Sequence, residues 1–348
     1  MLDQNSLFSS SLFQTPADID RLKCHVQTVA LAQGRRVGSP GHKVVADSIQ
    51  RLLQAMGAMP YRNAQFDLSY SLGGQNFTNV IGKISGKQCE TRPPILIGAH
   101  YDSSIDGACA DDNAAAVAIA LLVAETLAQS GGLMRDLVVA FFDAEEPPYF
   151  QTPQMGSEYF VKHQMISDGF HAALIMDLVG HDVKILPGME NFLFVTGAES
   201  HPSMRKVVAG SQPDALTVLP LSNSYVGDMS DHGAFRDRGI PYLFLSCGQW
   251  EHYHRPTDTP DRLNYDKMAA IAGMVHEYLH TMDAQDFRPK RRLFKTDDTL
   301  TLELEAINRA FGSELNPLLQ LLGISHLKTR KNLTQLVGAM MELGLNRE

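Results

Sequence analysis

The chain has 348 residues, of which 44% are hydrophobic and 20% are charged, a balance typical of a soluble globular protein. Its 30 basic and 39 acidic residues give a net charge of −9, which argues against nucleic acid as the main partner because phosphate backbones select basic surfaces. The four cysteines are far apart and form no Cys-x-x-Cys pair, so a zinc ribbon, a thioredoxin-like motif or a disulfide scaffold is not expected.

The amino-terminal residues lack both a basic segment and a continuous apolar segment, so they do not resemble a secretory signal. No apolar run in the sequence approaches the roughly 20 residues that a membrane span needs. We therefore expect a cytoplasmic protein that does not contact membranes. A secreted protein whose signal had been removed would have the same pattern.

The first third of the chain predicts two helices. Residues 1–16 are expected to form a loose leader, and a helix is expected to begin near Pro16, because Ile19, Leu22 and Val26 follow at helical spacing. A loop rich in glycine follows at 34–41, and the apolar spacing after it predicts a second helix over about 42–56.

Strands and helices then alternate as far as about residue 283. A strand-like pattern predicts strands at 79–84 and 95–99, and apolar runs typical of strands buried on both faces predict strands at 137–142 and 172–176. The stretch 113–129 is rich in alanine and leucine without a breaker and predicts a helix. This alternation predicts an α/β fold whose central sheet is mixed, mostly parallel, and covered by helices on both faces.

The composition changes after residue 285, which indicates three parts of the chain beyond the leader. We expect one α/β domain over 17–285, a basic linker over 286–297 and a helical tail over 298–348. The tail contains no cluster of metal-binding residues. It is expected either to pack against the core or to form a dimer contact or a lid over a cleft.

Five side chains of the types that bind divalent metals stand just past apolar runs or in turn-rich segments: His100, Asp112, Glu146, Asp177 and His254. Buried parallel strands place functional groups at their carboxyl ends, which share one edge of the sheet. His100, Glu146 and Asp177 each follow a predicted strand closely. The sequence therefore predicts that residues distant in the chain meet at one site.

This mixture of ligand types suits two zinc ions that share one carboxylate, a centre that activates water for hydrolysis. Glu145, directly before Glu146, offers a free carboxylate that can act as the base. Asp102, two residues after His100, can accept the imidazole N–H and fix its tautomer.

Six motifs together resemble the two-zinc exopeptidases of clan MH: His100-Tyr-Asp102, Ala-Asp111-Asp112-Asn-Ala, Phe-Phe-Asp-Ala-Glu145-Glu146, Met-Asp177, Ser230-Asp231-His232 and Tyr-His254-Arg-Pro-Thr-Asp258-Thr. That group includes bacterial double-zinc aminopeptidases, glutamate carboxypeptidase II and, as a one-zinc branch, glutaminyl cyclases. The resemblance covers about residues 20–283, and the loop at 34–41 also fits it.

The resemblance implies a role for each of the five ligands. His100 and Asp177 would bind one zinc, Glu146 and His254 would bind the other, and Asp112 would bridge both, so that two zinc ions are expected per chain. It also implies a cis peptide bond directly after the bridging aspartate.

The resemblance further implies that Glu145 is the general base and acid, that Asp102 orients His100, and that Tyr225 is a candidate for contact with the oxyanion or the substrate. The expected activity is removal of N-terminal residues from peptide substrates. A glutaminyl cyclase-like acyltransferase stays open as an alternative, because the segment 147–157 is longer than usual, as it is in the cyclases. A non-catalytic binding domain is the third alternative.

Overall fold

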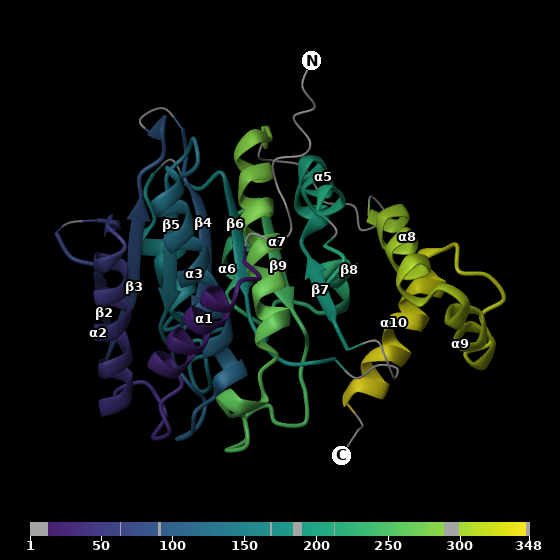
Figure 1. Ribbon diagram of the computed structural model, residues 1–348, viewed down its shortest axis with the longest axis horizontal. Helices are drawn as coiled ribbons and strands as arrows, with labels where there is room; N and C mark the ends of the chain where they lie inside the picture. Colours follow the sequence, from purple (N-terminus) through teal and green to yellow (C-terminus); the bar gives the residue numbers. More distant parts are fainter. Residues whose placement is uncertain are drawn as a thin grey trace.

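The computed structural model describes residues 13–345 except 63, 90–91, 168, 184–189, 212 and 289–298, and describes only the backbone of 341–345. The described residues form one mixed sheet of nine strands with helices on both faces (Figure 1). The strands are β1 (Met59–Pro60), β2 (Asp67–Leu72), β3 (Gln75–Ile84), β4 (Ile95–His100), β5 (Leu137–Phe142), β6 (Ala172–Met176), β7 (Phe192–Thr196), β8 (Thr217–Pro220) and β9 (Tyr242–Ser246). The predicted fold class is confirmed.

The strand order is β1-β3-β5-β4-β6-β9-β7-β8, with β2 paired to β3. The four central strands β5, β4, β6 and β9 are parallel, and the antiparallel pairs lie toward the two edges. Side chains of β4 alternate between two apolar clusters: Ile95 and Ile97 face one, and Leu96 faces the other. Both faces are buried, which explains why the central strands are apolar without interruption.

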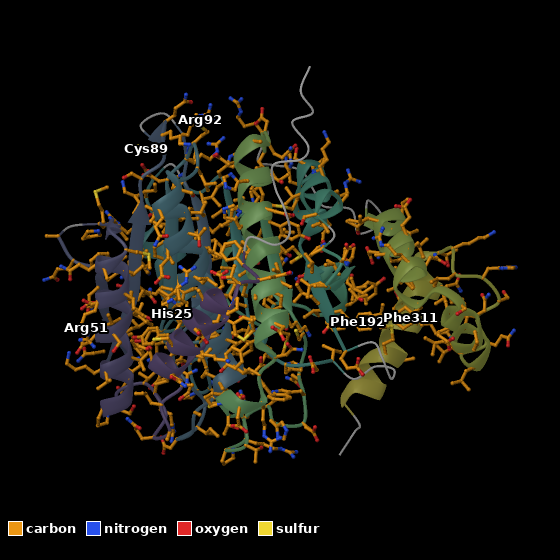
Figure 2. The ribbon with its side chains drawn as sticks, viewed as in Figure 1. His25, Arg51, Cys89, Arg92, Phe192 and Phe311 are labelled. Atoms are coloured by element: carbon orange, nitrogen blue, oxygen red, sulfur yellow. The ribbon has the colours of Figure 1, made fainter. Side chains whose placement is uncertain are left out.

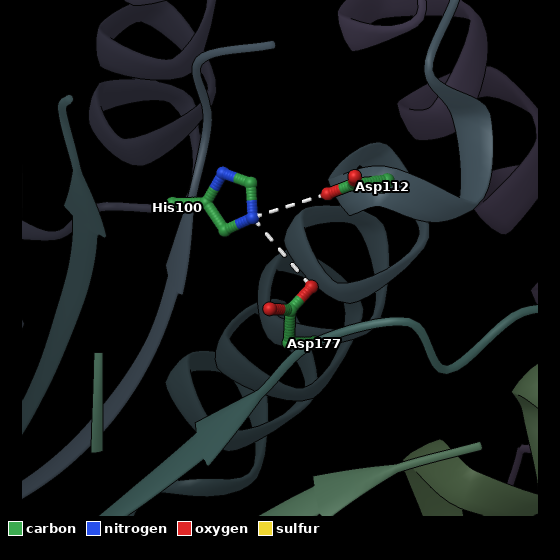
Figure 3. A group of neighbouring side chains, drawn as sticks. All are labelled: His100, Asp112 and Asp177. Carbon is green, nitrogen blue, oxygen red and sulfur yellow. Dashed lines mark ion pairs between the residues drawn. The ribbon is translucent and has the colours of Figure 1, made fainter. Parts of the chain in front are cut away.

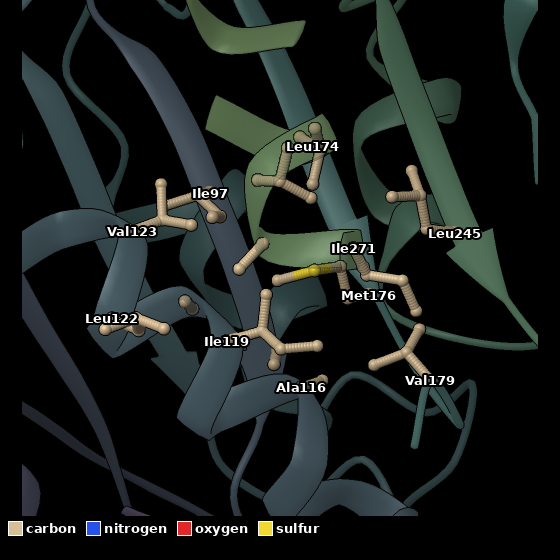
Figure 4. Close-up of a cluster of buried hydrophobic side chains, with 14 of the residues drawn as sticks. Ile97, Ala116, Ile119, Leu122, Val123, Leu174, Met176, Val179, Leu245 and Ile271 are labelled. Atoms are coloured by element: carbon tan, nitrogen blue, oxygen red, sulfur yellow. The ribbon is translucent and has the colours of Figure 1, made fainter. Parts of the chain in front are cut away.

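One face of the sheet is covered by long helices, and the other by shorter ones (Figure 1). The first face carries α1 (Pro16–Val29), α2 (Pro40–Ala55), α3 (Ala115–Ser130), α5 (Pro202–Gly210) and α7 (Tyr265–Ala284). The second carries α4 (Gly156–Tyr159), a continuing turn (Phe160–Gln164) and α6 (His232–Asp237). Figure 4 shows side chains of α3 and α7, including Ile119 and Ile271, packed against Leu174 and Met176 of β6.

Local sequence explains where the first helices begin. Thr15 caps α1 through a capping box with Asp18, and Ser39 caps α2 ahead of Pro40. Contrary to the expectation from sequence, the stretch Ala110–Ser130, which includes α3, is long and apolar enough to cross a membrane, but 72% of an 18-residue apolar window in it is buried within this molecule. Its composition is that of a core helix, because sheet and neighbouring helices surround it.

The C-terminal tail packs against β7 and β8 (Figure 1). It contains α8 (Leu300–Phe311), α9 (Leu315–Leu321) and α10 (Arg330–Leu345). Figure 2 shows Phe311 of α8 beside Phe192 of β7, and their ring centroids are 5.7 Å apart. The tail thus has the core contact expected of it, and the dimer contact stays a prediction.

Other predicted boundaries fall partly outside the described residues. Of the predicted leader, 1–12 lie outside them, whereas Phe13 is buried beside His276. Of the predicted basic linker, 289–297 lie outside them. Single-turn helices complete the described structure: Ala198–Ser200, Asn223–Tyr225, Pro260–Arg262 and Gly312–Glu314.

Candidate metal centre

The predicted ligands meet at the edge of the sheet formed by the carboxyl ends of the parallel strands. His100 is the last residue of β4, Glu146 lies four residues after β5, and Asp177 directly follows β6. Asp112 lies at a kink in the turn Ala110–Ala114 ahead of α3, where its backbone is not helical, and His254 lies in the loop that follows β9. Figure 3 shows His100, Asp112 and Asp177 converging from three different elements.

The five side chains form two groups that share Asp112. In the first, His100 Nε2 lies 3.3 Å from Asp112 Oδ1 and 3.5 Å from Asp177 Oδ1. In the second, His254 Nε2 lies 3.1 Å from Asp112 Oδ2 and 3.1 Å from Glu146 Oε2. The two oxygens of one carboxylate therefore face different groups, which is the arrangement a bridging ligand needs.

These residues suit divalent cations better than they suit one another. Each of the five has a buried polar atom without a hydrogen-bond partner: His100 Nε2, Asp112 Oδ2, Glu146 Oε1, Asp177 Oδ1 and His254 Nε2. Among the described residues, no lysine or arginine forms an ion pair with the three carboxylates, so positive charge is missing from the cluster. Imidazole nitrogen and carboxylate oxygen are ligands that zinc accepts.

The pKa values of the cluster reflect the same lack of lysine and arginine charge. Burial, reinforced by the charge of Asp112, raises the pKa of Glu146 to about 8. Burial alone would lower the pKa of the His254 ring, but Asp112 and Glu146 raise it to about 10. Burial alone would raise the pKa of Asp112, yet the rings of His100 and His254 hold it below its usual range. These pKa shifts show that the buried carboxylates and imidazoles lie close enough to interact strongly, as ligands of shared cations would.

Asp102 and Glu145 lie next to the ligands without joining either group. Asp102 Oδ1 lies 3.3 Å from His100 Nδ1, and it accepts the backbone N–H of Glu145 at 3.1 Å. Asp102 Oδ2 accepts the backbone N–H of Glu146 at 3.2 Å. One buried carboxylate therefore orients an imidazole and also positions the Glu145-Glu146 pair. Sequence analysis predicted only the first contact.

Glu145 is buried, and its Oε2 lies 3.8 Å from His100 Nε2. Burial, together with the charges of Asp177 and Glu146, raises its pKa well above the usual value. A buried carboxyl group beside a metal centre is placed to take up and release a proton. This position suits the base that the sequence predicted.

Arg35 is a positioning residue that sequence analysis missed. Its guanidinium is fully buried and donates to the backbone carbonyls of Tyr101, Ala108, Cys109 and Asp112, at 2.6, 2.7, 2.9 and 3.1 Å. It therefore holds the loop between the predicted ligands His100 and Asp112. The only signal in the sequence was its place in the loop 34–41, because bonds to backbone carbonyls leave no side-chain pattern.

Asp258 and Asp111 connect the ligand loops. Asp258 accepts the backbone N–H of Asp111 at 2.9 Å and of Asp112 at 3.1 Å, which links the loop of His254 to the bridging residue. Asp111 accepts the backbone N–H of Gly180 and the His181 Nδ1–H, each at 2.6 Å, which links it to the loop after β6. These carboxylates fix the backbone that carries the ligands.

The backbone around the centre is unusual. The peptide bond Asp112–Asn113 is cis, as the resemblance implied. Four non-glycine residues at or near the predicted ligands have positive φ: Cys109, Ala144, Leu178 and His254. Positive φ at a non-glycine residue costs about 1–3 kcal/mol and persists where surrounding contacts enforce it, commonly at functional sites.

A cavity of about 330 Å³ lies beside Asp177. Tyr225 lines it, and the Tyr225 hydroxyl accepts a hydrogen bond from Arg330 Nη1 at 3.0 Å. His232, in the Ser230-Asp231-His232 motif, is fully buried, and its Nε2 lies 3.1 Å from the Gly227 carbonyl oxygen. His232 is thus part of the support for the loop before α6 and belongs to neither metal-binding group.

Comparison with known proteins identifies the family. Residues 79–279 match the model of peptidase family M28. The Escherichia coli (strain K12) protein YfbL, named as uncharacterized, is 28% identical over 219 residues, which cover 54% of this chain and 67% of YfbL.

Several solved structures share the fold. The glutaminyl cyclase of Porphyromonas gingivalis has a TM-score of 0.61 at 18% identity, covering 75% of this chain and 97% of its own. The LapA aminopeptidase of Legionella pneumophila has a TM-score of 0.63 at 18% identity, covering 77% and 72%. A leucine aminopeptidase precursor of Bacteroides thetaiotaomicron VPI-5482 has a TM-score of 0.60 at 18% identity, covering 77% and 98%. The family match spans more than half of the sequence, so this chain belongs to peptidase family M28 and is a metallopeptidase.

Proposed function

We propose that this protein is a two-zinc aminopeptidase that removes N-terminal residues from peptides. His100 and Asp177 would hold one zinc, Glu146 and His254 the other, and Asp112 both. The arrangement of Asp112, whose oxygens face two separate imidazoles at 3.3 and 3.1 Å, supports two ions rather than one. Each group contributes one nitrogen and two carboxylates, which are ligand types that zinc accepts.

The charge of the cavity lining indicates which end of a peptide the site accepts. Asp177 is the only charged side chain among the described residues that line it, and no lysine or arginine is present there. A substrate's C-terminal carboxylate would find no lysine or arginine to pair with in this lining, so the site favours an aminopeptidase over a carboxypeptidase.

Glu145 performs the proton transfers in the proposed mechanism. Bound zinc would supply the charge that polarises the scissile carbonyl and activates water. The Glu145 carboxylate takes a proton from the attacking water, whose oxygen bonds to the carbonyl carbon. When the C–N bond breaks, Glu145 gives that proton to the leaving nitrogen. Asp102 keeps Glu145 in place through its backbone N–H, and Tyr225 is a candidate to contact the substrate or its oxyanion.

A glutaminyl cyclase-like activity is the second candidate, supported by the shared fold with the P. gingivalis enzyme. Such an enzyme attacks with the substrate's own amino group and releases ammonia instead of an amino acid. The two groups sharing Asp112 favour hydrolysis, because the one-zinc chemistry does not require the second group.

One experiment distinguishes the candidates. Purified protein is analysed for zinc and assayed, with and without chelator, on aminoacyl p-nitroanilides, dipeptides and peptides with N-terminal glutamine. About two zinc ions per chain and chelator-sensitive release of N-terminal residues are expected. Ammonia release from N-terminal glutamine alone would establish the cyclase instead, and a metal-free, inert protein would indicate a binding domain.

A further inference from the structure

The cavity beside Asp177 is closed on one side by the C-terminal tail. Val337 and Met340 of α10 line it together with residues of the sheet and of the loops after β8 and β9. Both tail side chains are buried, at 2% and 8% exposure. The residues matching the family model end at 279, so α10 lies outside the matched region.

The lining of this cavity is apolar apart from Asp177 and a few neutral polar groups. Apolar side chains line it from several elements: Leu178, Val183, Phe194, Leu221, Val226, Met229, Phe244, Val337 and Met340. Its volume of about 330 Å³ is at the lower end of the roughly 300–1,000 Å³ of ligand pockets. A space of this size and polarity suits one apolar side chain held next to the metal centre.

The tail is attached to this cavity by a partly buried ion pair. At the start of α10, Arg330 Nη1 donates to Glu303 Oε1 and Oε2 of α8 at 2.8 and 2.7 Å. The same nitrogen donates to the hydroxyl of Tyr225, which is itself in the cavity wall. Glu303 is fully buried, and Leu333 and Leu336 anchor the next turns of α10 in the apolar cluster on β7 and β8. These contacts fix the distance of α10 from Asp177.

We propose that the tail is a specificity element: Val337 and Met340 form the wall of the pocket for the substrate's N-terminal side chain and set the largest side chain that it accepts. This inference rests on the proposed aminopeptidase function. Because the wall comes from a helix outside the region that matches the family model, the tail sets the size limit in this chain.

Two substitutions change the wall in opposite directions. Val337→Phe fills the pocket, and Met340→Ala enlarges it. Thr334→Phe is the matched control, since Thr334 has nearly the same shape as Val337 and lies on the exposed side of the same helix. For each variant, kcat/KM is measured with alanyl, leucyl and phenylalanyl p-nitroanilides, after circular dichroism and urea unfolding have verified folding.

For Val337→Phe, kcat/KM is expected to fall about 10-fold or more for leucyl and phenylalanyl substrates and to stay within about twofold for alanyl substrates. The reason is that one methylene group in an apolar pocket changes kcat/KM by about 10-fold or more. Met340→Ala is expected to improve the phenylalanyl-to-alanyl ratio several-fold, and Thr334→Phe to leave all ratios unchanged. Equal losses on all three substrates, or equal effects of Val337→Phe and Thr334→Phe, would overturn the proposal. If Val337→Phe does not fold, Met340→Ala decides alone.

A binding measurement separates this proposal from the proposed function. Binding of L-leucinol and L-alaninol, which contain no hydrolysable bond, is measured by calorimetry on the zinc-loaded wild type and variants. Val337→Phe should weaken L-leucinol binding about 10-fold and leave L-alaninol unchanged, whereas Thr334→Phe should affect neither. If the wild type hydrolyses no aminoacyl substrate, the aminopeptidase proposal fails, and this binding difference alone supports the tail as the wall. Unchanged L-leucinol binding in Val337→Phe overturns it.

Discussion

Replacing Asp102 by asparagine tests whether one carboxylate organises the metal centre. The Asp102 side chain is 1% exposed and has three neighbours that offer N–H groups: His100 Nδ1 at 3.3 Å and the backbone nitrogens of Glu145 and Glu146 at 3.1 and 3.2 Å. An asparagine side chain keeps one acceptor oxygen and places an NH₂ donor where the second oxygen was. At least one of the three N–H groups is then left facing a donor.

The expected size of the effect follows from these contacts. A buried donor without a partner costs about 1–3 kcal/mol. Loss of the residue that orients a metal-binding imidazole lowers metal affinity or activity about 10- to 100-fold. Asp102→Asn should therefore bind zinc about 10- to 100-fold more weakly in the group containing His100, and added zinc should restore part of its activity.

Zinc affinity is measured by competition with a chromogenic chelator, and stability by urea unfolding. Asp136→Asn is the control, because Asp136 is also a largely buried carboxylate that accepts a backbone N–H, from Gly86 at 2.9 Å, but it precedes β5, at the opposite end of the strand from the centre. The control should lose stability without losing zinc affinity. Wild-type zinc affinity in Asp102→Asn, or an equal loss in both variants, would refute the reasoning.

Three further predictions concern the buried His232, the removal of zinc and the packing around Gly156. Burial lowers the pKa of His232 to about 4, so between pH 6.5 and 4 the unfolded chain binds a proton that the folded chain does not. The unfolding free energy should therefore fall by up to about 3 kcal/mol as the pH drops through this range. In urea unfolding of the metal-free protein, the unfolding free energy of His232→Gln should depend less steeply on pH. Equal slopes would contradict this assignment. Removing zinc with a chelator should lower the unfolding free energy by about 4 kcal/mol per ion if free zinc stands at about 1,000 times its Kd, and an unchanged Tm would argue against metal binding. In Gly156→Ala the new Cβ would collide with the Asn79 side chain and the Asp143 backbone, so the unfolding free energy should fall by about 3 kcal/mol or more. In the control Gly338→Ala the new Cβ meets open space, so the unfolding free energy should stay the same or rise by up to about 1 kcal/mol.

The central strands were predictable from sequence because both of their faces are buried. β5 and β6 have the predicted bounds, 137–142 and 172–176, and their continuous apolar runs have no other stable placement in an α/β fold. β1, β2, β7 and β8 were not predicted individually. The outer face of β2 is exposed, and β8 is only four residues long, so the sequence of each gives a weaker signal.

The residues of the site also divide into those that the sequence predicted and those that it did not. The convergence of His100, Glu146 and Asp177 was predictable because each follows a buried parallel strand. Arg35 and Asp258 were not predicted as positioning residues, since they act on backbone groups far away in the chain and such contacts exist only after folding. The contribution of α10 to the cavity was equally hidden, because the apolar spacing of the tail is the same for packing on the core and for closing a pocket.

The role of Glu145 is tested most directly by the turnover of Glu145→Gln at full zinc occupancy. Glutamine keeps the shape of the side chain and cannot accept the proton of water, and Glu145 lies outside both metal-binding groups. The proposed mechanism predicts wild-type zinc content and a kcat on leucyl p-nitroanilide reduced at least about 10²- to 10⁴-fold, the contribution of a general base. A zinc-loaded Glu145→Gln variant with near wild-type kcat would contradict it.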